Sequence, residues 1–343
     1  MRRILSIQSH VVSGYVGNRA ATFPLQLLGH EVDVINTVQF SNHTGYNTVR
    51  GTRFSDTQLR ELFEGLCDNG LDTGYSHLLS GYIGNSGNVR AVEEIARSLR
   101  RTNPDLVFVL DPVLGDDGAL YVPEELVSLY RDVLCPLANI ITPNQFEAEA
   151  LSGISISSLE DARAVCNKLH SLGVPDVVIT SLALPAADAQ SEEEEKEEEE
   201  ERDRSGLLYL VGSQQTTHGG EKKTQCFYIA FPRLYGYFTG SGDLFTALVA
   251  ARHASVSESA ADSEKEGAAG VVLAQACELA IATQAGVMRE TELFQQQTGV
   301  AVSSDSLRRG SRPSEMVRGF ELRIIQSQNL ITHPVLEHRA VLF

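Results

Sequence analysis

Short apolar segments alternate with segments of helical periodicity along most of the sequence, and this alternation restricts the fold more than any other feature. The predicted strands are Arg2–Gln8, Glu31–Asn36, Ser76–Ser80, Leu106–Leu110, Asn139–Ile141 and Asp176–Ile179. Ala20–Leu28 and Leu159–Leu172 are two of the predicted helices. Because Leu106–Leu110 is almost continuously apolar, we expect both faces of its sheet to be covered. The pattern predicts an α/β fold, with one mainly parallel central sheet in a three-layer α/β/α sandwich.

The whole chain, residues 1–343, is predicted to form a single domain, because strand-like segments resume after each interruption of the pattern. The later predicted strands are 207–211, 225–231 and a closing strand at 321–325. Residues 188–204 contain 11 acidic and 3 basic residues, so they carry −8 of the formal net charge of −17. We predict that this acidic insertion is disordered, since its charges repel one another and it has almost no apolar residues. Residues 255–267 and 291–312 are predicted to be polar insertions.

Composition excludes several classes of protein. A chain this acidic is repelled by phosphate backbones, so we expect no nucleic-acid partner. The five cysteines are scattered and form no C-x-x-C pair, which disfavours a disulfide framework and a zinc site. The first residues lack the apolar core of a secretory signal, and polar residues interrupt the most apolar later run, 268–288. We therefore expect a cytoplasmic protein that does not bind membranes.

The stretch Phe238–Phe245 carries the strongest chemical signal. Gly240 and Gly242 flank Ser241, and Asp243 follows at the start of a helical pattern. Glycine lets the backbone approach a ligand closely, and the N–H groups at a helix start bind phosphate. A bound phosphate repels a carboxylate, so Asp243 is explained if it takes a proton from a hydroxyl that attacks the phosphorus. The alternative is that Asp243 only caps the helix.

Polar motifs follow several predicted strands directly. They are Ser9-His10, Val38–Tyr46, Gly81-Tyr82, Asp111–Asp116, Thr142–Glu147 and Thr180-Ser181. Ligands of open parallel sheets bind beyond the carboxyl ends of the strands, so we expect these motifs to share one site. Taken singly, His43 is explained as a loop histidine, Asp111 as a strand end, and Phe40 and Tyr82 as core aromatics. Neither G-x-x-x-x-G-K-[ST] nor G-x-G-x-x-G occurs, which disfavours a P-loop or dinucleotide site.

The motif Thr239–Asp243 resembles the anion hole of the ribokinase-like superfamily. Five other motifs resemble pyridoxal kinases more narrowly, namely Ser6–Val11, Gly14–Asn18, Gln39–Tyr46, Asp111–Asp116 and Ile141–Glu147. The resemblance runs from Ile4 to about Thr180 and returns at Phe238–Ala251 and Glu321–Ser327. It implies a ribokinase-like fold and ATP-dependent phosphorylation of the 5′-hydroxymethyl group of pyridoxal, pyridoxine and pyridoxamine in vitamin B6 salvage. It also implies a homodimer.

The resemblance further implies roles for individual residues. Asp243 would be the catalytic base, and the N–H groups of Gly240, Ser241 and Gly242 would stabilise the transferred phosphoryl group. The residues implied to bind substrate are Ser9, Val38, Phe40, His43, Thr44, Tyr82 and Asp243. Those implied to bind ATP are Asn144, Glu147, Thr180, Ser181, Leu234, Tyr235, Gly236, Gly240 and Ser241. Those implied at metal ions are Asp111, Asp116, Thr142 and Glu147, whose oxygen atoms suit Mg²⁺ or another divalent cation and a monovalent K⁺ or Na⁺.

Two segments depart from the family pattern. The loop from Asp116 to Tyr121 is shorter than in the animal enzymes, and Gln214–Arg233, where the flap over ATP is expected, matches poorly. Lys222 and Lys223 in that segment are candidates to screen phosphate charge. Two other functions stay open. One is a ribokinase-like kinase of another small alcohol such as a hydroxymethylpyrimidine, and the other is an inactive relative that binds pyridoxal compounds.

Overall fold

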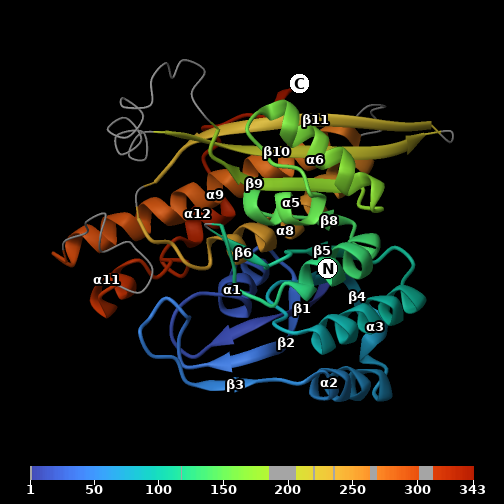
Figure 1. Ribbon diagram of the computed structural model, residues 1–343, viewed down its shortest axis with the longest axis horizontal. Coiled ribbons are helices and arrows are strands. Elements are labelled where there is room, and N and C mark those ends of the chain that lie inside the picture. The colour runs from blue at the N-terminus through green and yellow to red at the C-terminus, as the bar shows by residue number, and fades with distance from the viewer. Residues whose placement is uncertain are drawn as a thin grey trace.

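One twisted sheet runs through the molecule, with helices on both of its faces (Figure 1). A computed structural model describes residues 2–116, 118–184, 206–218, 221–234, 236–262, 269–300 and 312–343, and the predicted disordered segment 188–204 lies outside these ranges. Within them, ten strands form the sheet in the order β12-β11-β10-β9-β8-β5-β4-β1-β2-β3. Its strands are β1 (Arg3–Val11), β2 (Glu31–Phe40), β3 (Gly51–Arg53), β4 (Tyr75–Ser80), β5 (Val107–Leu110), β8 (Ile140–Ile141), β9 (Asp176–Leu182), β10 (Leu207–His218), β11 (Glu221–Pro232) and β12 (Val341–Leu342).

The six strands from β2 to β9 in this order are mutually parallel, which confirms the predicted sheet. Antiparallel strands close both sides: β3 pairs with β2, and β10, β11 and β12 extend the sheet beyond β9. A separate hairpin of β6 (Gly115–Asp116) and β7 (Ala119–Leu120) follows β5. The parallel strands point their carboxyl ends toward one edge of the sheet, and the predicted motifs follow those ends.

Two layers of helices bury the two faces of the sheet. One layer contains α1 (Asn18–Leu27), α8 (Ser241–Asp262), α9 (Ala269–Gln297) and α12 (Gln328–Thr332). The other contains α2 (Asp56–Asp68), α3 (Ser86–Thr102), α4 (Glu125–Leu129), α5 (Gln145–Ser152) and α6 (Leu159–Ser171), together with the short turns Leu71–Gly74, Tyr130–Leu134 and Cys135–Leu137. The helix α11 (Ser314–Gly319) packs against α9. In the described ranges, no helix combines the length and apolar character needed to cross a membrane.

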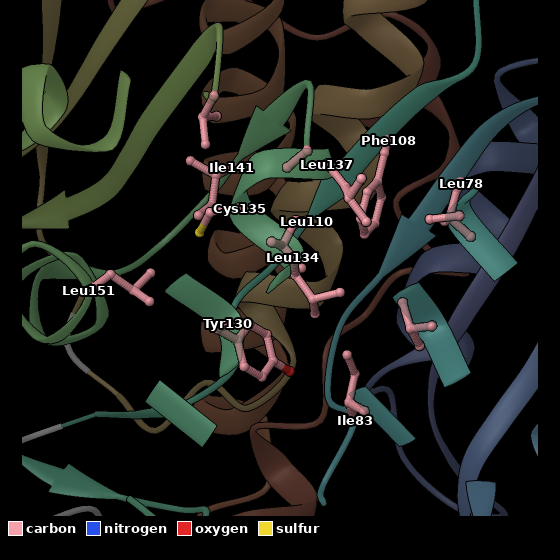
Figure 2. Packing of buried hydrophobic residues seen from close by; sticks show 14 of the residues in the cluster. Leu78, Ile83, Phe108, Leu110, Tyr130, Leu134, Cys135, Leu137, Ile141 and Leu151 are labelled. Carbon is pink, nitrogen blue, oxygen red and sulfur yellow. The ribbon is translucent and has the colours of Figure 1, made fainter. Parts of the chain in front are cut away.

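Strand β5 shows why its sequence is continuously apolar. Phe108 and Leu110 belong to the core on one face, whereas Val109 belongs to the core on the other. Side chains alternate across a strand, so a strand covered on both faces needs apolar residues at every position. Figure 2 shows Phe108 and Leu110 beside Leu134 and Leu137, which come from the short turns after α4.

The two predicted polar insertions are partly helical, which corrects the prediction. Residues 255–262 continue α8, and residues 291–297 continue α9, while 263–268 and 301–311 lie outside the described ranges. The hydroxyl groups of Ser255, Ser257 and Ser259 each donate to the carbonyl four residues earlier. These bonds satisfy the polar side chains within the helix, so a serine-rich sequence does not end it.

The predicted closing strand at 321–325 is also wrong. This segment is a turn between α11 and α12, and the last strand of the sheet is β12. Leu322 and Ile324 are fully buried, and Arg323 between them is more exposed. This alternating burial has the period of a strand, although residues 321–325 belong to none of the strands in the described part of the chain.

The segment Gln214–Arg233 forms most of a regular hairpin of β10 and β11, and not a flap at the site. Gln214 pairs with Asp176 at the amino end of β9, so the strands continue from there to the pair His218 and Glu221 at the edge opposite the carboxyl ends (Figure 1). Lys222 and Lys223 lie on β11 next to Glu221. Their suggested role in screening phosphate charge is therefore wrong for this arrangement.

We predict that Phe108→Ala lowers the free energy of unfolding by about 3–5 kcal/mol, because it removes a fully buried ring and leaves a cavity between β5 and the turns. Chemical denaturation with a spectroscopic readout measures the change. Leu62→Ala on α2 is the control, since this side chain is 50% exposed. Its effect is expected to stay within about 0.5 kcal/mol. Equal effects of the two substitutions would contradict the described core.

Candidate active site

The predicted polar motifs meet at the carboxyl edge of the sheet, as expected. Ser9 lies on β1, and Thr180 and Ser181 lie near the end of β9. Asp111 directly follows β5, and Thr142 directly follows β8. The amino end of α8 reaches the same edge, because a Cβ added at Gly242 would lie 3.9 Å from Oδ2 of Asp111.

The glycine-rich motif begins α8, and the loop between β1 and α1 packs directly against it. Gly240 has a φ of 84°, and a Cβ at this position would lie 2.0 Å from the carbonyl oxygen of Tyr15. Both facts require glycine. The N–H of Leu244 donates to the Gly240 carbonyl at 3.0 Å, so the helix begins here. The N–H groups of its first turn have no intrahelical acceptor, and the helix dipole makes this end partially positive. This geometry suits an anion.

Asp243 lies in the first turn of α8 and is held by the β1–α1 loop. The N–H of Gly17 donates to its carboxylate. The pKa of Asp243 is raised to about 6. Burial of the carboxyl group is the cause, and the hydrogen bond from Gly17 offsets part of its effect. A Cβ at Gly17 would lie 2.1 Å from the carbonyl oxygen of Ser9, so the close approach requires glycine. A carboxyl group with this pKa can accept and release a proton near neutral pH.

The geometry distinguishes this role from simple capping. The helix starts at Ser241, so Asp243 is its third residue and not the residue before it. Its carboxylate bonds to Gly17 of another loop. The charge at this place still stabilises the helix through the dipole. The carboxylate is nevertheless oriented by the β1–α1 loop, as a base facing a bound substrate requires.

Two buried carboxyl groups lie near Asp243, which is itself partly buried. Asp111 is 6% exposed and Glu147 is 4% exposed. Burial, followed by the charges of Glu147 and Asp243, raises the pKa of Asp111 well above its usual value. Burial likewise raises the pKa of Glu147. The hydroxyl of Thr246 donates to Asp111, and the Thr142 and Thr246 hydroxyl oxygens lie 2.8 Å apart. Thr142 and Thr246 thus support the carboxyl cluster.

Glu147 and Asn144 form a capping box at the start of α5. The carboxylate of Glu147 accepts N–H bonds from Leu114 at 2.9 Å and from Asn144 at 3.0 Å. The side chain of Asn144 donates to the Gly115 carbonyl at 2.8 Å. The pair therefore fixes the loop after β5 to the loop after β8. Its predicted contacts with ATP and metal ions stay predictions.

The residues implied at metal ions fit a magnesium site that is completed by phosphate and water. The buried carboxyl oxygens of Asp111 and Glu147 are hard ligands, and the pKa of each group is raised by burial, so a bound cation would stabilise their charged forms. Asp116 is exposed on β6, and its charge acts on Glu147. Among the described residues, no three acidic, histidine or cysteine side chains are placed to hold a metal ion by themselves. Mg²⁺ commonly binds through one or two carboxylates and substrate phosphates, so this arrangement suits it.

Most residues implied to bind substrate lie on the neighbouring strands β1 and β2 or in the loop after β2, whereas Tyr82 follows β4 and Asp243 lies on α8. Ser9 pairs with Val38 in the register of these strands, and Phe40 lies two residues further along the same face of β2. A cavity of about 220 Å³ is lined by Val38, Tyr82 and Arg53 among others. The Arg53 guanidinium donates to the Tyr82 hydroxyl at 3.0 Å and lies over the Phe40 ring. The exposed Thr44 is in the loop after β2.

His43, which the resemblance implies at the substrate, is held by other parts of the protein through both ring nitrogens. It is 5% exposed. Its Nδ1 accepts the N–H of Gly45 at 3.1 Å, and its Nε2 lies 3.1 Å from a carboxylate oxygen of Glu321. Both ring nitrogens are therefore occupied. In this conformation, only the ring itself is available to a substrate.

The predicted ATP-binding residues include two on β9 and three in the segment before the glycine motif. Thr180 and Ser181 are partly exposed, whereas most of β9 is buried. A Cβ at Gly236 would lie 2.4 Å from the ring of Phe320, so the segment before the glycine motif packs against the turn after α11. Leu234 is partly buried, and Tyr235 lies outside the described residues.

Sequence reasoning missed three residues of this site. Gly17 lies in the motif Gly14–Asn18, but nothing in the sequence indicates that its N–H contacts the predicted base. Thr246 lies in an apolar helical stretch and gave no separate signal. Glu321 was assigned to a strand, and its contact with a loop 278 residues earlier has no local signature.

The fold and this site define a kinase that phosphorylates a small alcohol, of the ribokinase-like type. The sequence profile of a family described as phosphomethylpyrimidine kinase matches residues 32–286. A pyridoxal kinase of Arabidopsis thaliana is 42% identical over 338 residues, which are 98% of this chain and 94% of that protein. A pyridoxal kinase of Homo sapiens is 40% identical over 339 residues, or 97% of this chain and 96% of that protein.

A solved structure leads to the same family. The pyridoxal kinase of Leishmania donovani in complex with ADP and pyridoxamine has a TM-score of 0.79 at 32% identity, and the similarity covers 100% of both chains. The chain belongs to the pyridoxal kinase family. The predicted ribokinase-like fold is thereby confirmed.

The pKa of Asp243 predicts the pH dependence of the reaction. A base must be ionised, so kcat/KM for the alcohol substrate should rise with pH through about pH 6 and reach a plateau above it. Below that pKa, kcat/KM should fall about tenfold for each pH unit. Initial rates between about pH 5 and 8 at constant ionic strength measure the profile. A flat profile would contradict this assignment of the base.

Proposed function

We propose that this chain transfers the γ-phosphoryl group of ATP to the 5′-hydroxymethyl group of pyridoxal, pyridoxine and pyridoxamine. The observation that carries the proposal is the partly buried Asp243, held by Gly17 beside the free N–H groups at the start of α8. This arrangement places a base next to an anion site. The substrate class is supported by the related pyridoxal kinases, one of which was solved with ADP and pyridoxine.

The chemistry follows from the arrangement. Asp243 takes the hydroxyl proton while the 5′ oxygen forms a bond to the γ-phosphorus. The bond from that phosphorus to the oxygen bridging to the β-phosphate breaks, and ADP leaves. The N–H groups of Gly240, Ser241 and Gly242 stabilise the negative charge on the phosphoryl oxygens during transfer. Asp243 then releases its proton to solvent, for which a pKa of about 6 is suitable.

We further infer that Asp111, Asp116, Thr142 and Glu147 bind Mg²⁺ and a monovalent cation, directly or through water. Bound cations would neutralise phosphate charge next to the carboxyl cluster. Asn144, Thr180, Ser181, Leu234, Tyr235 and Gly236 are proposed to contact ATP. Ser9, Val38, Phe40, His43, Thr44 and Tyr82 are proposed to surround the pyridine ring.

Two properties of the assembled protein are also proposals. We propose a cytoplasmic location, and the five cysteines support it because all are free, as expected in a reducing compartment. We propose a homodimer from the family resemblance. Light scattering coupled to size-exclusion chromatography tests the dimer.

A second candidate is phosphorylation of a hydroxymethylpyrimidine, which the description of the matching family profile favours. Rates with pyridoxal, pyridoxine, pyridoxamine and hydroxymethylpyrimidine under identical conditions separate the two candidates. A preference for the pyrimidine would overturn the proposed substrate. No turnover of any of them would favour an inactive relative.

We predict that Asp243→Asn lowers kcat for pyridoxal by about 10² or more, because the amide cannot accept the proton. The KM for ATP should change little, since the N–H groups of α8 are retained. Steady-state kinetics with both substrates measures these values. Asp105→Asn is the control, because Asp105 is exposed and precedes β5 at the opposite edge. Near-normal kcat in Asp243→Asn would mean that another group accepts the proton.

A further inference from the structure

Glu321 brings the C-terminal part of the chain to the loops of the active site. It follows α11, which lies on the side of the sheet where β1 and β2 end (Figure 1). Its side chain is 14% exposed. One carboxylate oxygen accepts from the Tyr46 hydroxyl at 3.0 Å and lies 3.1 Å from His43 Nε2. The other accepts the N–H of Tyr15 at 3.1 Å. One carboxylate thus connects three groups on two loops.

The contacts of His43 with Gly45 and Glu321 determine which ring nitrogen carries the proton. The N–H of Gly45 donates to Nδ1, so this nitrogen has no proton. The neutral ring therefore carries its proton on Nε2 and donates it to Glu321. A ring held at both nitrogens fixes the loop from His43 to Tyr46, which contains the proposed substrate residue Thr44.

Through Tyr15, Glu321 is also connected to the proposed phosphate-binding part of the site. Glu321 holds the N–H of Tyr15, and the carbonyl oxygen of Tyr15 packs against Gly240 of the anion site. Two residues later, Gly17 donates to Asp243. A Cβ at Gly14 would lie 2.6 Å from the Glu321 carboxylate, so glycine at 14 allows this approach. The same carboxylate therefore supports the loop that orients the proposed base.

We propose that Glu321 is a positioning residue. It holds the loop after β2, which contains the proposed substrate residue Thr44, in a fixed position relative to the β1–α1 loop. It acts through His43, Tyr46 and Tyr15 and touches no reacting atom. The substrate it serves is that of the proposed function, so this part of the inference rests on that proposal. The placement of the two loops by Glu321 does not depend on the identity of the substrate.

Glu321→Gln tests the proposal with little change of volume. An amide has only one acceptor oxygen, and its NH₂ group would face the Tyr15 N–H or the His43 Nε2–H. We expect kcat/KM for pyridoxal to fall at least about tenfold, the effect of losing one hydrogen bond to a charged group. The KM for ATP should change less than the KM for pyridoxal. Equal increases in both would overturn the specific role in the substrate loop.

Glu278→Gln is a matched control. Glu278 is 12% exposed, accepts the backbone N–H of Ala340 at 2.9 Å and pairs with Arg339, so it also holds a distant segment. It lies on α9 and contacts the end of the chain, away from the glycine motif. We expect kcat/KM for pyridoxal in Glu278→Gln to stay within about twofold of the value for the unsubstituted enzyme. If Glu321→Gln behaves like Glu278→Gln, the proposal is wrong.

A structural readout separates this proposal from the proposed function. Hydrogen–deuterium exchange should be faster in Glu321→Gln for peptides that cover residues 13–17 and 42–47, and unchanged there in Glu278→Gln. Unchanged exchange in both variants overturns the proposal whatever the substrate is. A different pair of results would overturn only the proposed function. In that case exchange is faster in Glu321→Gln, but the unsubstituted protein does not phosphorylate pyridoxal.

Tyr46→Phe provides a second, milder variant if Glu321→Gln fails to fold. It removes the hydroxyl that donates to Glu321 and keeps the ring beside His43. We expect a several-fold rise in KM for pyridoxal. The double variant should change KM by less than the product of the single changes, because both act through the same carboxylate. Independent effects would contradict the coupling.

Discussion

The gathering of three carboxyl groups where the sheet edge meets α8 is the constraint on which the site depends. Asp111 and Glu147 are buried, and Asp243 is partly buried. Asp111, Glu147 and Asp243 lose water and lie close enough for their charges to raise the pKa of Asp111. Burial of a charge is tolerated only where nearby groups compensate it. Here the compensation comes from the backbone N–H groups of Gly17 and Leu114 and from the Thr246 hydroxyl. The loops must therefore adopt the conformations that present these donors.

This requirement explains the glycines around the site. A side chain at Gly17 would collide with the Ser9 backbone, and one at Gly240 would collide with Tyr15. The β1–α1 loop lies between the anion site on one side and Glu321 on the other, and at Gly14 and Gly17 there is space only for backbone. Glycine meets this demand because it has no Cβ and tolerates positive φ.

The site also shows how one fold divides two tasks between neighbouring parts of the sheet edge. Strands β1 and β2 and the loops after β2 and β4 contain the residues proposed for the pyridine ring. The segments after β5 and β8 and the end of β9 contain most of those proposed for ATP and cations. The start of α8 lies between them and contributes both the base and the anion site. This order matches the general placement of ligands beyond the carboxyl ends of parallel strands.

The sequence by itself determined the sheet, its parallel core and the set of motifs at its edge. Apolar runs such as Leu106–Leu110 and the segment Phe238–Phe245 are local patterns, and their physical causes act within a few residues. The two long helices exceeded their predicted ends, because serine and threonine hydroxyls bond to their own helix carbonyls. The composition of these segments does not show that their hydroxyl groups form hydrogen bonds within the helix.

Only the tertiary structure decided which distant groups meet. The bond from Gly17 to Asp243, the contact of Glu321 with His43 and the position of Lys222 at the opposite edge all join or separate residues through the topology of the sheet. The raised pKa of Asp243 follows from burial, which is a property of the assembled chain. The sequence shows which groups are able to take part in chemistry. The packing of the chain decides their protonation and the distances between them, because these two properties depend on neighbours that lie far apart along the chain.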